Sequence, residues 1–216
     1  EAAKYNKSAY ASIGLMYYKK VSKKKGKEKY MEGWKKGDLE SAYELGIVYS
    51  NYEKNDKEAE KWWKLAGEKG HSNSQYSLGF MYKENGNYSD SIDWYTKAAE
   101  QGNMEAQYNL GLLFDDRNNI EKAEYWYKKA AEQGLLQAQY NLGVLYNYKK
   151  DYRQAEYWYK KAIEQGDVEA RYNLGVMYDE NLKDLTQAEY WYNEALKNGY
   201  EDAKIRLESI ERRRRK

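Results

Sequence analysis

Apolar residues recur with helical spacing along the whole chain. The segment "MEAQYNLGLLF" places them at i, i+4, i+7 and i+8, and the following segment "KAEYWYKKAAEQG" repeats that kind of spacing. This pattern marks one face of an α-helix. The positions concerned are Ala106, Leu110, Leu113 and Phe114, then Ala123, Trp126, Tyr127, Ala130 and Ala131. No stretch alternates apolar and polar residues long enough to indicate a sheet, so the chain is predicted to be all-α.

Two glycine landmarks recur every 32 or 33 residues. The first stands inside a short apolar stretch, at Gly14, Gly46, Gly79, Gly111, Gly143 and Gly175. The second follows the second helical segment, at Gly37, Gly70, Gly102, Gly134, Gly166 and Gly199. Two independent markers that keep one period indicate a stack of repeated units.

The period predicts six helix-turn-helix units and a capping helix, or thirteen helices in all. The predicted units are about 5–37, 38–70, 71–102, 103–134, 135–166 and 167–199, and residues 200–216 form the cap and a basic tail. The cap is expected because the apolar face of the last unit otherwise has no neighbour to cover it.

Local signals support these boundaries. Asp151 with Gln154, and Asp184 with Gln187, have the spacing of a capping pair at the start of a second helix. The closing glycine suits the left-handed residue that ends a helix.

The mid-helix glycine needs a structural reason, because glycine there costs about 1 kcal/mol relative to alanine. We expect it to let the second helix approach closely at Ala123 and Ala130. The recurring tryptophans are expected to fill the core between units: Trp62, Trp94, Trp126, Trp158 and Trp191.

The pattern "AQYNLGLLF…AEYWYKKAAEQG" resembles the Sel-one-like repeat, a branch of the tetratricopeptide superfamily. The resemblance covers nearly the whole chain and is weakest in the first unit, where Gly26 and Gly33 stand at alanine positions. The glycine-containing insertion usual between the two helices of this family is missing, so the superhelical pitch stays open. The resemblance implies a right-handed α-solenoid whose first helices line the inner face.

A second stripe on the first helices is the candidate binding surface. A tyrosine stands three residues before most landmark glycines and an apolar residue follows each glycine, so the two share one helix face at i and i+4. The candidate residues are Tyr43, Tyr76, Tyr108, Tyr140 and Tyr172, with Phe80, Leu112, Val144 and Val176. The alternative is that the tyrosines pack between adjacent first helices.

The chemistry of this stripe favours a protein or peptide partner. In tetratricopeptide domains that clamp a terminal carboxylate, the matching positions carry lysine, arginine and asparagine. Tyrosine and aliphatic residues instead favour an amphipathic helix or an extended segment with apolar anchors. The leading interpretation is therefore a protein-interaction scaffold without catalysis of its own.

Composition removes several other functions. The chain has no cysteine and one histidine, His71, which excludes disulfides, thiolate metal sites and multi-histidine sites. No phosphate-binding loop or nucleophile motif occurs. We expect no cofactor and no enzymatic activity, and His71 is predicted to be a solvated turn residue. An enzyme-associated module stays the alternative, although the cysteine-rich relatives linked to such activity differ from this chain.

Charge gathers at both ends of the chain. Residues 1–37 hold eleven lysines and three acidic residues, and residues 205–216 hold six basic and two acidic residues, within a total net charge of +2. "VSKKKGKEKY" and "ERRRRK" are expected to be a solvated helix edge and a frayed tail. Weak binding of nucleic acid or an anionic surface through these ends is the alternative. The acidic middle makes nucleic acid an unlikely partner.

The compartment stays open at this point. The sequence begins at Glu1 without methionine, shows no signal peptide, and contains no apolar stretch long enough to span a membrane. The composition suits a bacterial protein, and both the cytoplasm and export are compatible with it.

Overall fold

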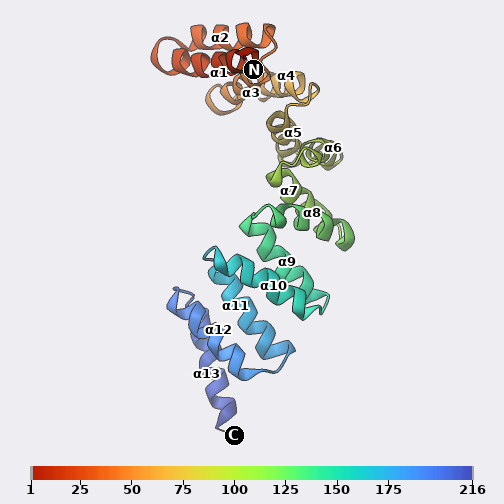
Figure 1. The fold of residues 1–216 in the computed structure, drawn as a ribbon, viewed down its shortest axis with the longest axis vertical. Helices are drawn as coiled ribbons and strands as arrows, with labels where there is room; N and C mark the ends of the chain where they lie inside the picture. Colours follow the sequence, from red (N-terminus) through yellow and green to blue (C-terminus); the bar gives the residue numbers. More distant parts are fainter. Residues whose placement is uncertain (1, 216) are drawn as a thin grey trace. The chain divides into compact units, whose positions relative to one another are not determined.

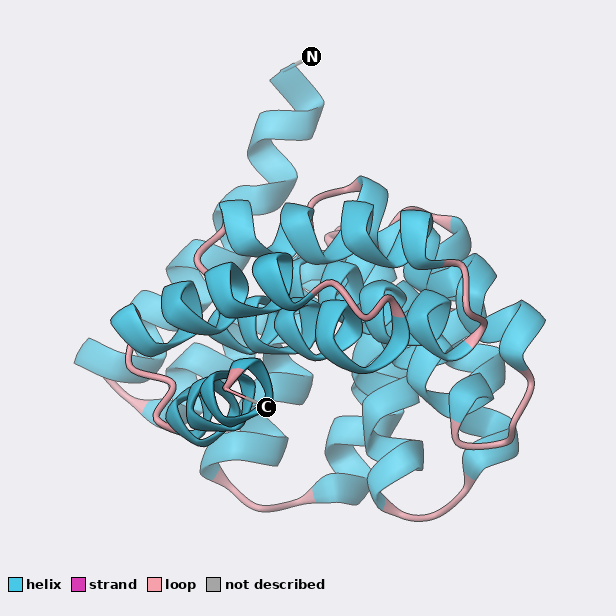
Figure 2. Ribbon diagram, turned by 90° about the horizontal axis from the view of Figure 1, so that it is seen from below, coloured by secondary structure: helices cyan, strands magenta, loops and turns pink. Residues whose placement is uncertain are grey.

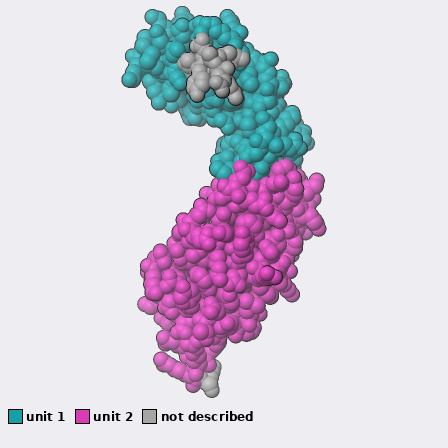
Figure 3. Space-filling model, in the orientation of Figure 1, with its two compact units in different colours: residues 1–110 teal, residues 111–216 magenta. Residues whose placement is uncertain are grey.

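Consecutive helices pack against one another within the chain, from α1 to α6 and from α8 to α13 (Figures 1 and 2). The structure, a computed structural model, describes residues 2–215, with side chains from residue 10 onward. Contacts divide it into two compact units, Glu1–Leu110 and Gly111–Lys216 (Figure 3). Thirteen α-helices and no strand occur in the described part, which confirms the predicted class and helix number. The handedness of the superhelix stays a prediction.

The helices alternate between first and second members of a pair. In the first unit they are α1 (Ala2–Lys20), α2 (Lys23–Lys35), α3 (Leu39–Ile47), α4 (Asp56–Gly67), α5 (Ser72–Glu84) and α6 (Tyr88–Glu100), and α7 (Met104–Asp115) carries the chain into the second unit. The second unit continues with α8 (Ile120–Glu132), α9 (Leu136–Tyr148), α10 (Tyr152–Glu164), α11 (Val168–Val176), α12 (Leu185–Lys197) and α13 (Asp202–Arg214).

The predicted helix ends are confirmed. The closing glycines all adopt the left-handed conformation, with φ between 84° and 95°. At α8, Leu135 N–H donates to the Ala130 carbonyl over 3.1 Å, which completes the hydrogen bonding of the helix end. The five second helices α4, α6, α8, α10 and α12 all start at an asparagine or aspartate whose side chain accepts the backbone N–H three residues on. The cap of α12 also accepts the N–H two residues on. Asp151 and Asp184 are among these caps, as expected.

Each mid-helix glycine faces an aromatic ring of the second helix. The pairs are Gly14–Tyr30, Gly46–Trp63, Gly79–Tyr95, Gly111–Tyr127, Gly143–Tyr159 and Gly175–Tyr192. A Cβ on Gly143 would lie 2.4 Å from Cδ1 of Tyr159, closer than carbon atoms can approach. The expectation that Ala123 and Ala130 are the partners of the glycine is wrong, because the space that the glycine leaves is filled by a ring.

The tyrosine after the recurring tryptophan is the deepest aromatic residue. Tyr95, Tyr127 and Tyr192 have no exposed surface, whereas Trp62 is 9% exposed and Trp126 is half-buried. The expectation that the tryptophans form the centre of the core is therefore only partly right. The reason is helical phase: the tyrosine lies four residues after the small residue that starts the buried face, and the tryptophan lies three residues after it, nearer the edge.

Two π-helical turns adjust the repeat length. In most pairs 12 residues separate the landmark glycine from the small residue of the second helix, but 13 separate Gly46 from Ala59 and Gly175 from Ala188. At both places the first helix continues as a π-helix, η1 (Val48–Tyr52) and η2 (Met177–Asn181). A π-turn absorbs one added residue. The ring of the second helix therefore still reaches its glycine.

Buried glutamines join successive pairs, a feature that the sequence analysis missed. Gln139 Nε2 donates to the Ala131 carbonyl over 3.2 Å, and Gln165 Nε2 donates to Gln139 Oε1 over 2.8 Å. In the first unit Gln75 bonds the Gly67 carbonyl in the same way. The glutamine satisfies a backbone group at the end of the preceding helix, which would be costly to leave unpaired in the core.

The last helix, α13, caps the second unit. Ala203 and Ile210 are buried against Ala188 and Tyr192 of α12. The Arg213 guanidinium bonds both carboxylate oxygens of Asp179, at 2.7 and 2.9 Å. Glu189 of α12 pairs with Arg214. The expectation of a frayed "ERRRRK" tail is therefore wrong up to Arg214, because carboxylates of η2 and α12 hold the arginines.

We expect Gly143→Ala to destabilise the protein by about 1–3 kcal/mol, as overpacked cores do. The added Cβ meets the Tyr159 ring, which has no room to retreat. Gly67→Ala is the matched control, because its Cβ would meet only side chains, at 3.1 Å or more. That variant should be neutral or gain up to about 1 kcal/mol from helix propensity. Chemical denaturation measures both, and a Gly143→Ala variant as stable as the parent would contradict the ring-clearance explanation.

We expect Arg213→Gln to lower stability by about 1–3 kcal/mol, because it leaves a buried carboxylate without its charged partner. The Asp179 side chain is only 3% exposed. Arg212→Gln is the control, since Arg212 is exposed and bonds only the carbonyl of Glu208 in its own helix. Thermal melts of the two variants should separate clearly; coincident melts would mean that the Asp179 pair does not hold the cap.

Stability should fall in alkaline solution. Burial raises the pKa of Tyr95 and Tyr192 well above the usual value, and raises that of Tyr178 to about 12. Unfolded tyrosines ionise near pH 10, so above that pH the unfolded chain releases protons that the folded chain retains. The contribution of these tyrosines to stability is therefore constant below about pH 10 and decreases as the pH rises through their folded pKa values.

Denaturant unfolding at increasing pH tests this alkaline loss. Tyr95→Phe should reduce it and leave stability at neutral pH unchanged, because the buried Tyr95 hydroxyl has no hydrogen-bond partner among the described residues. Tyr148→Phe, at a side chain 74% exposed, should behave like the parent. Equal alkaline loss in the Tyr95→Phe variant would show that another group titrates.

Candidate partner-binding site between the first helices

The predicted stripe lies on the first helices, from Tyr43 on α3 to Tyr172 on α11. All five of its tyrosines are half-buried. The residues that follow the glycines differ more: Phe80 is 46% exposed and Val144 is 42% exposed, whereas Leu112 and Val176 are half-buried. The apolar half of the stripe therefore offers the larger accessible surface.

The tyrosines connect neighbouring helices of each unit. The Tyr140 ring lies 6.3 Å from the Tyr159 ring, between centroids, and the Tyr140 hydroxyl accepts a hydrogen bond from Asn173 Nδ2 over 2.8 Å. Tyr172 repeats this arrangement with the Tyr192 ring at 5.6 Å and Arg206 Nε at 3.2 Å. Each ring thus packs on the second helix of its own pair, and each hydroxyl reaches the next first helix.

Tyrosines of the first unit follow the same plan. The Tyr76 and Tyr95 ring centroids are 5.7 Å apart, and the hydroxyl of Tyr43 forms a hydrogen bond with Ser77, 34 residues along the chain. Burial raises the pKa of Tyr43, Tyr76 and Tyr140. Their hydroxyls therefore stay protonated at neutral pH and act as donors as well as acceptors.

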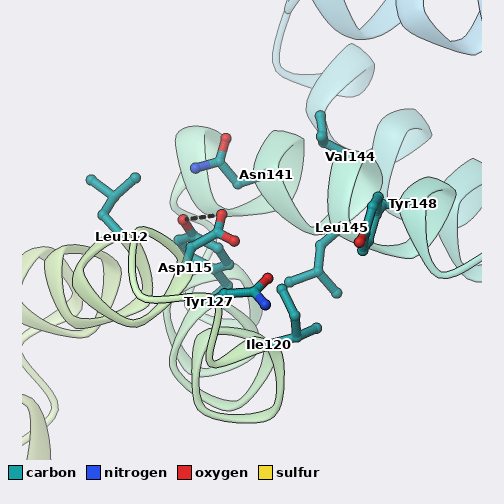
Figure 4. Close-up of a pocket in the computed structure, with 9 residues that line it drawn as sticks. Leu112, Asp115, Ile120, Tyr127, Asn141, Val144, Leu145 and Tyr148 are labelled. Atoms are coloured by element: carbon teal, nitrogen blue, oxygen red, sulfur yellow. Dashed lines mark hydrogen bonds between the residues drawn. The ribbon is translucent and has the colours of Figure 1, made fainter.

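A groove of about 410 Å³ opens in the second unit beside α9 (Figure 4). Leu112 of α7 and Val144 of α9 both line it, so the structure brings these two predicted residues together. Its complete lining is Leu112, Asp115, Asn118, Ile120, Tyr127, Asn141, Val144, Leu145 and Tyr148. Asp115 accepts a hydrogen bond from the Tyr127 hydroxyl over 3.3 Å.

The lining of this groove combines apolar walls with a polar edge. Ile120, Val144 and Tyr148 supply apolar surface, and Tyr148 is 74% exposed. Asp115 and Asn141 add a carboxylate and an amide. A carboxylate accepts several hydrogen bonds at once, so Asp115 has capacity for a ligand beside its bond to tyrosine. The arrangement suits a ligand that carries a short apolar side chain next to its own backbone amides or next to a cationic group.

A second groove, of about 250 Å³, lies in the first unit between α3 and α5. Predicted residues Tyr76 and Phe80 line it, and the remaining lining is Ile47, Ser50, Asn51, Trp63 and Ser77. Trp63 is fixed by a bond of 3.1 Å from its Nε1 to the Tyr43 carbonyl.

The two grooves occupy the same place in the repeat. Ile47 and Phe80 follow landmark glycines in one groove, as Leu112 and Val144 do in the other. Trp63 and Tyr127 are the ring-forming residues opposite the glycines. A groove between consecutive first helices thus occurs at the same repeat position in both units, with different polar residues in each.

The sequence analysis missed Asn118 and Tyr148, the two residues of the second-unit groove that do not recur from repeat to repeat. Asn118 lies in the turn after α7 with φ of 55°, and Tyr148 ends α9. A search for periodic positions discards such residues. The left-handed asparagine in a polar turn was the one available signal.

His71 corrects another expectation. Its Nδ1 accepts the Ser74 backbone N–H over 3.2 Å, and its Nε2 lies 3.1 Å from Glu40 Oε2. The side chain is only 15% exposed. His71 is therefore the N-cap of α5 and a link to α3, and the predicted solvated turn residue is wrong, because its ring nitrogens satisfy two polar groups there.

Two further observations limit the chemistry. Among the described residues, no group of three or more histidine, cysteine, aspartate or glutamate side chains could hold a metal ion. Within the same part of the chain, every helix is too short or too polar to cross a bilayer.

Comparison with known families places the chain. The model of the Sel1 repeat matches residues 39–71, 72–103, 105–135, 136–167 and 168–200. This protein therefore belongs to the Sel1-repeat family, as the resemblance indicated. Proteins of this fold commonly act as scaffolds for protein interactions. Among curated proteins, none matches the sequence.

Solved structures agree with this assignment. A protective antigen of uropathogenic Escherichia coli with an SLR fold is 28% identical with a TM-score of 0.79, over 95% of this chain and 49% of the antigen. This chain thus spans about half the length of that relative. A Sel1 repeat protein from Oxalobacter formigenes is 26% identical with a TM-score of 0.67, over 88% and 87% of the two chains. YrrB, a TPR protein with an unusual peptide-binding site, shares the fold at 18% identity, with a TM-score of 0.61, over 79% and 92%.

Proposed function

We propose that this protein is a non-catalytic scaffold that binds peptide segments of partner proteins in the grooves between its first helices. The observation that supports this most directly is the recurrence of one groove at one repeat position in both units. Each groove has partly exposed apolar residues at its floor and hydrogen-bonding side chains at its edge. Repetition of a weak site lets a repeat protein hold an extended segment at several points.

The apolar residues are the proposed direct contacts. Phe80 and Val144 are the most exposed members of the stripe, and Leu112 shares a groove with Val144. Val176 is proposed to extend the surface, although it also packs against the capped core around Tyr192. Large exposed apolar side chains in a concave lining are the usual anchors of binding energy.

The tyrosines are proposed to form the walls of the site. Tyr140 and Tyr172 combine ring packing with hydroxyls that reach the next first helix, and Tyr43, Tyr76 and Tyr108 are proposed to act in the same way because they occupy the same repeat position. Both interpretations of the sequence thus apply to the same residues, because a half-buried tyrosine stabilises the stack and presents an edge to a ligand.

The expected ligand carries a small aliphatic side chain beside a basic residue. The groove of the second unit accepts the aliphatic group between Leu112 and Val144, and Asp115 attracts a cation at its edge. YrrB, a TPR protein with an unusual peptide-binding site, shares the fold, which supports the proposal. Arg206, Arg213 and Arg214 of α13 are occupied by intramolecular ion pairs, which makes a nucleic-acid role for the C-terminal end less favoured.

Peptides selected from a random displayed library against the parent protein test the proposal. We expect enrichment of sequences with an aliphatic anchor, and Val144→Asp should weaken their affinity by about 10- to 100-fold, the range of interface hot spots. Its melting temperature should stay near that of the parent because Val144 is 42% exposed. Tyr157→Ala, at a side chain half exposed on the second helix α10, is the control and should bind normally.

Two results would contradict the proposed site. Selected peptides that bind Val144→Asp as tightly as the parent would place the contact elsewhere. Peptides that lose affinity equally in Tyr157→Ala would indicate the second-helix face.

A further inference from the structure

The turn between α1 and α2 gathers the largest block of uncompensated positive charge in the first unit. Five exposed lysines surround it: Lys19, Lys20, Lys23, Lys24 and Lys25. Within the described residues none of the five forms an ion pair, although Lys27, two residues later, pairs with Glu53 at 2.7 Å.

Close packing of the two helices concentrates these lysines. A Cβ on Gly26 would lie 2.5 Å from the Cα of Tyr18, so glycine lets the backbones of α1 and α2 approach directly behind the turn. Ser22 N–H donates to the Tyr17 carbonyl over 2.8 Å and closes the connection. The end of α1 and the start of α2 therefore bring their lysines together at one end of the helix pair.

Helix stability explains only part of this charge. Lys19 and Lys20 lie in the last turn of α1, where the helix dipole favours cations. Lys23, Lys24 and Lys25 lie in the first turn of α2, where cations are unfavourable, and that turn has no acidic residue and no side-chain capping bond from Ser22. These three lysines are thus placed against the local electrostatics of their helix, as expected for a surface that meets an external anion.

Apolar side chains project from the same edge. Val21, at the tip of the turn, is 57% exposed, and Met16, one turn back on α1, is 47% exposed. Ile13 continues this face at 36%. Basic side chains around exposed apolar ones are the composition of peripheral membrane contacts, where lysines meet anionic headgroups and apolar groups enter the interface.

We propose that the α1–α2 turn attaches the protein to the surface of a bilayer that contains anionic lipids. The apolar tip favours a bilayer over nucleic acid. Nucleic acid is bound through phosphate contacts supplemented by base stacking or edge contacts. The two aromatic residues nearest to the tip, Tyr17 and Tyr18, are half-buried and buried, so neither ring is fully exposed for stacking. Such attachment needs no membrane-spanning helix and does not depend on the proposed peptide grooves.

Vesicle flotation tests the proposal on the whole protein. At low ionic strength we expect binding to vesicles of phosphatidylserine and phosphatidylcholine, and none to phosphatidylcholine alone. Neutralising Lys23, Lys24 and Lys25 with glutamine should weaken the partition about fivefold for each lysine, or about 100-fold together. Val21→Asn should weaken it by a further factor of about five, because it removes the apolar contact.

Controls separate this surface from the rest of the molecule. Arg212→Gln with Arg215→Gln removes two exposed charges from α13 and should leave vesicle binding unchanged. Val144→Asp should also leave it unchanged, which distinguishes it from the peptide site. High salt should abolish binding, because exposed charges are screened.

Several results would overturn the proposal. These are equal binding to neutral vesicles, no binding of the parent protein at low salt, or full binding by the triple glutamine variant. A duplex oligonucleotide that binds the parent, and loses affinity in the glutamine variant while vesicles do not bind, would assign the turn to nucleic acid instead.

Discussion

The contact between a mid-helix glycine and an aromatic ring is the constraint on which the rest of the fold depends. The ring of Tyr159 lies where the side chain of any other residue at position 143 would begin. The glycine weakens its own helix, yet it lets a large ring become fully buried against the backbone of the neighbouring helix. Burying an aromatic side chain removes about 150–250 Å² from water, which outweighs about 1 kcal/mol of lost helix propensity.

Other features preserve this contact along the chain. Where a pair carries one extra residue, a π-turn takes it up, so Trp63 and Tyr192 still meet Gly46 and Gly175. The left-handed glycine at the end of each second helix redirects the chain into the next pair. In α13 the landmark position is occupied by Glu208, which leaves no space for a further ring, and arginines bind the last pair instead. The cap thus ends the packing pattern and also replaces it with ion pairs.

The same packing creates the proposed binding surface. Because each ring is drawn toward its glycine, the residue after the glycine is turned outward between consecutive first helices, where Phe80, Leu112 and Val144 line grooves. The tyrosine three residues earlier is held between both neighbours and forms the wall. In the proposed function, stability and recognition therefore use adjacent positions on one helix. A substitution in the wall is expected to affect both, whereas one at the exposed apolar position is expected to affect mainly recognition.

The sequence by itself determined the class, the helix number, the caps and the location of the stripe, because these follow from local periodicity and from glycine and asparagine conformations that need no distant partner. It also indicated that Leu112 and Val144 share a surface. Tertiary structure decided which aromatic residue meets each glycine, because a difference of one helical position between Trp158 and Tyr159 sets their depth. It also decided the pairing of Arg213 with Asp179, the capping role of His71 and the participation of Asn118 and Tyr148 in a groove. These depend on single residues brought together across the fold, and a periodic pattern carries no record of them.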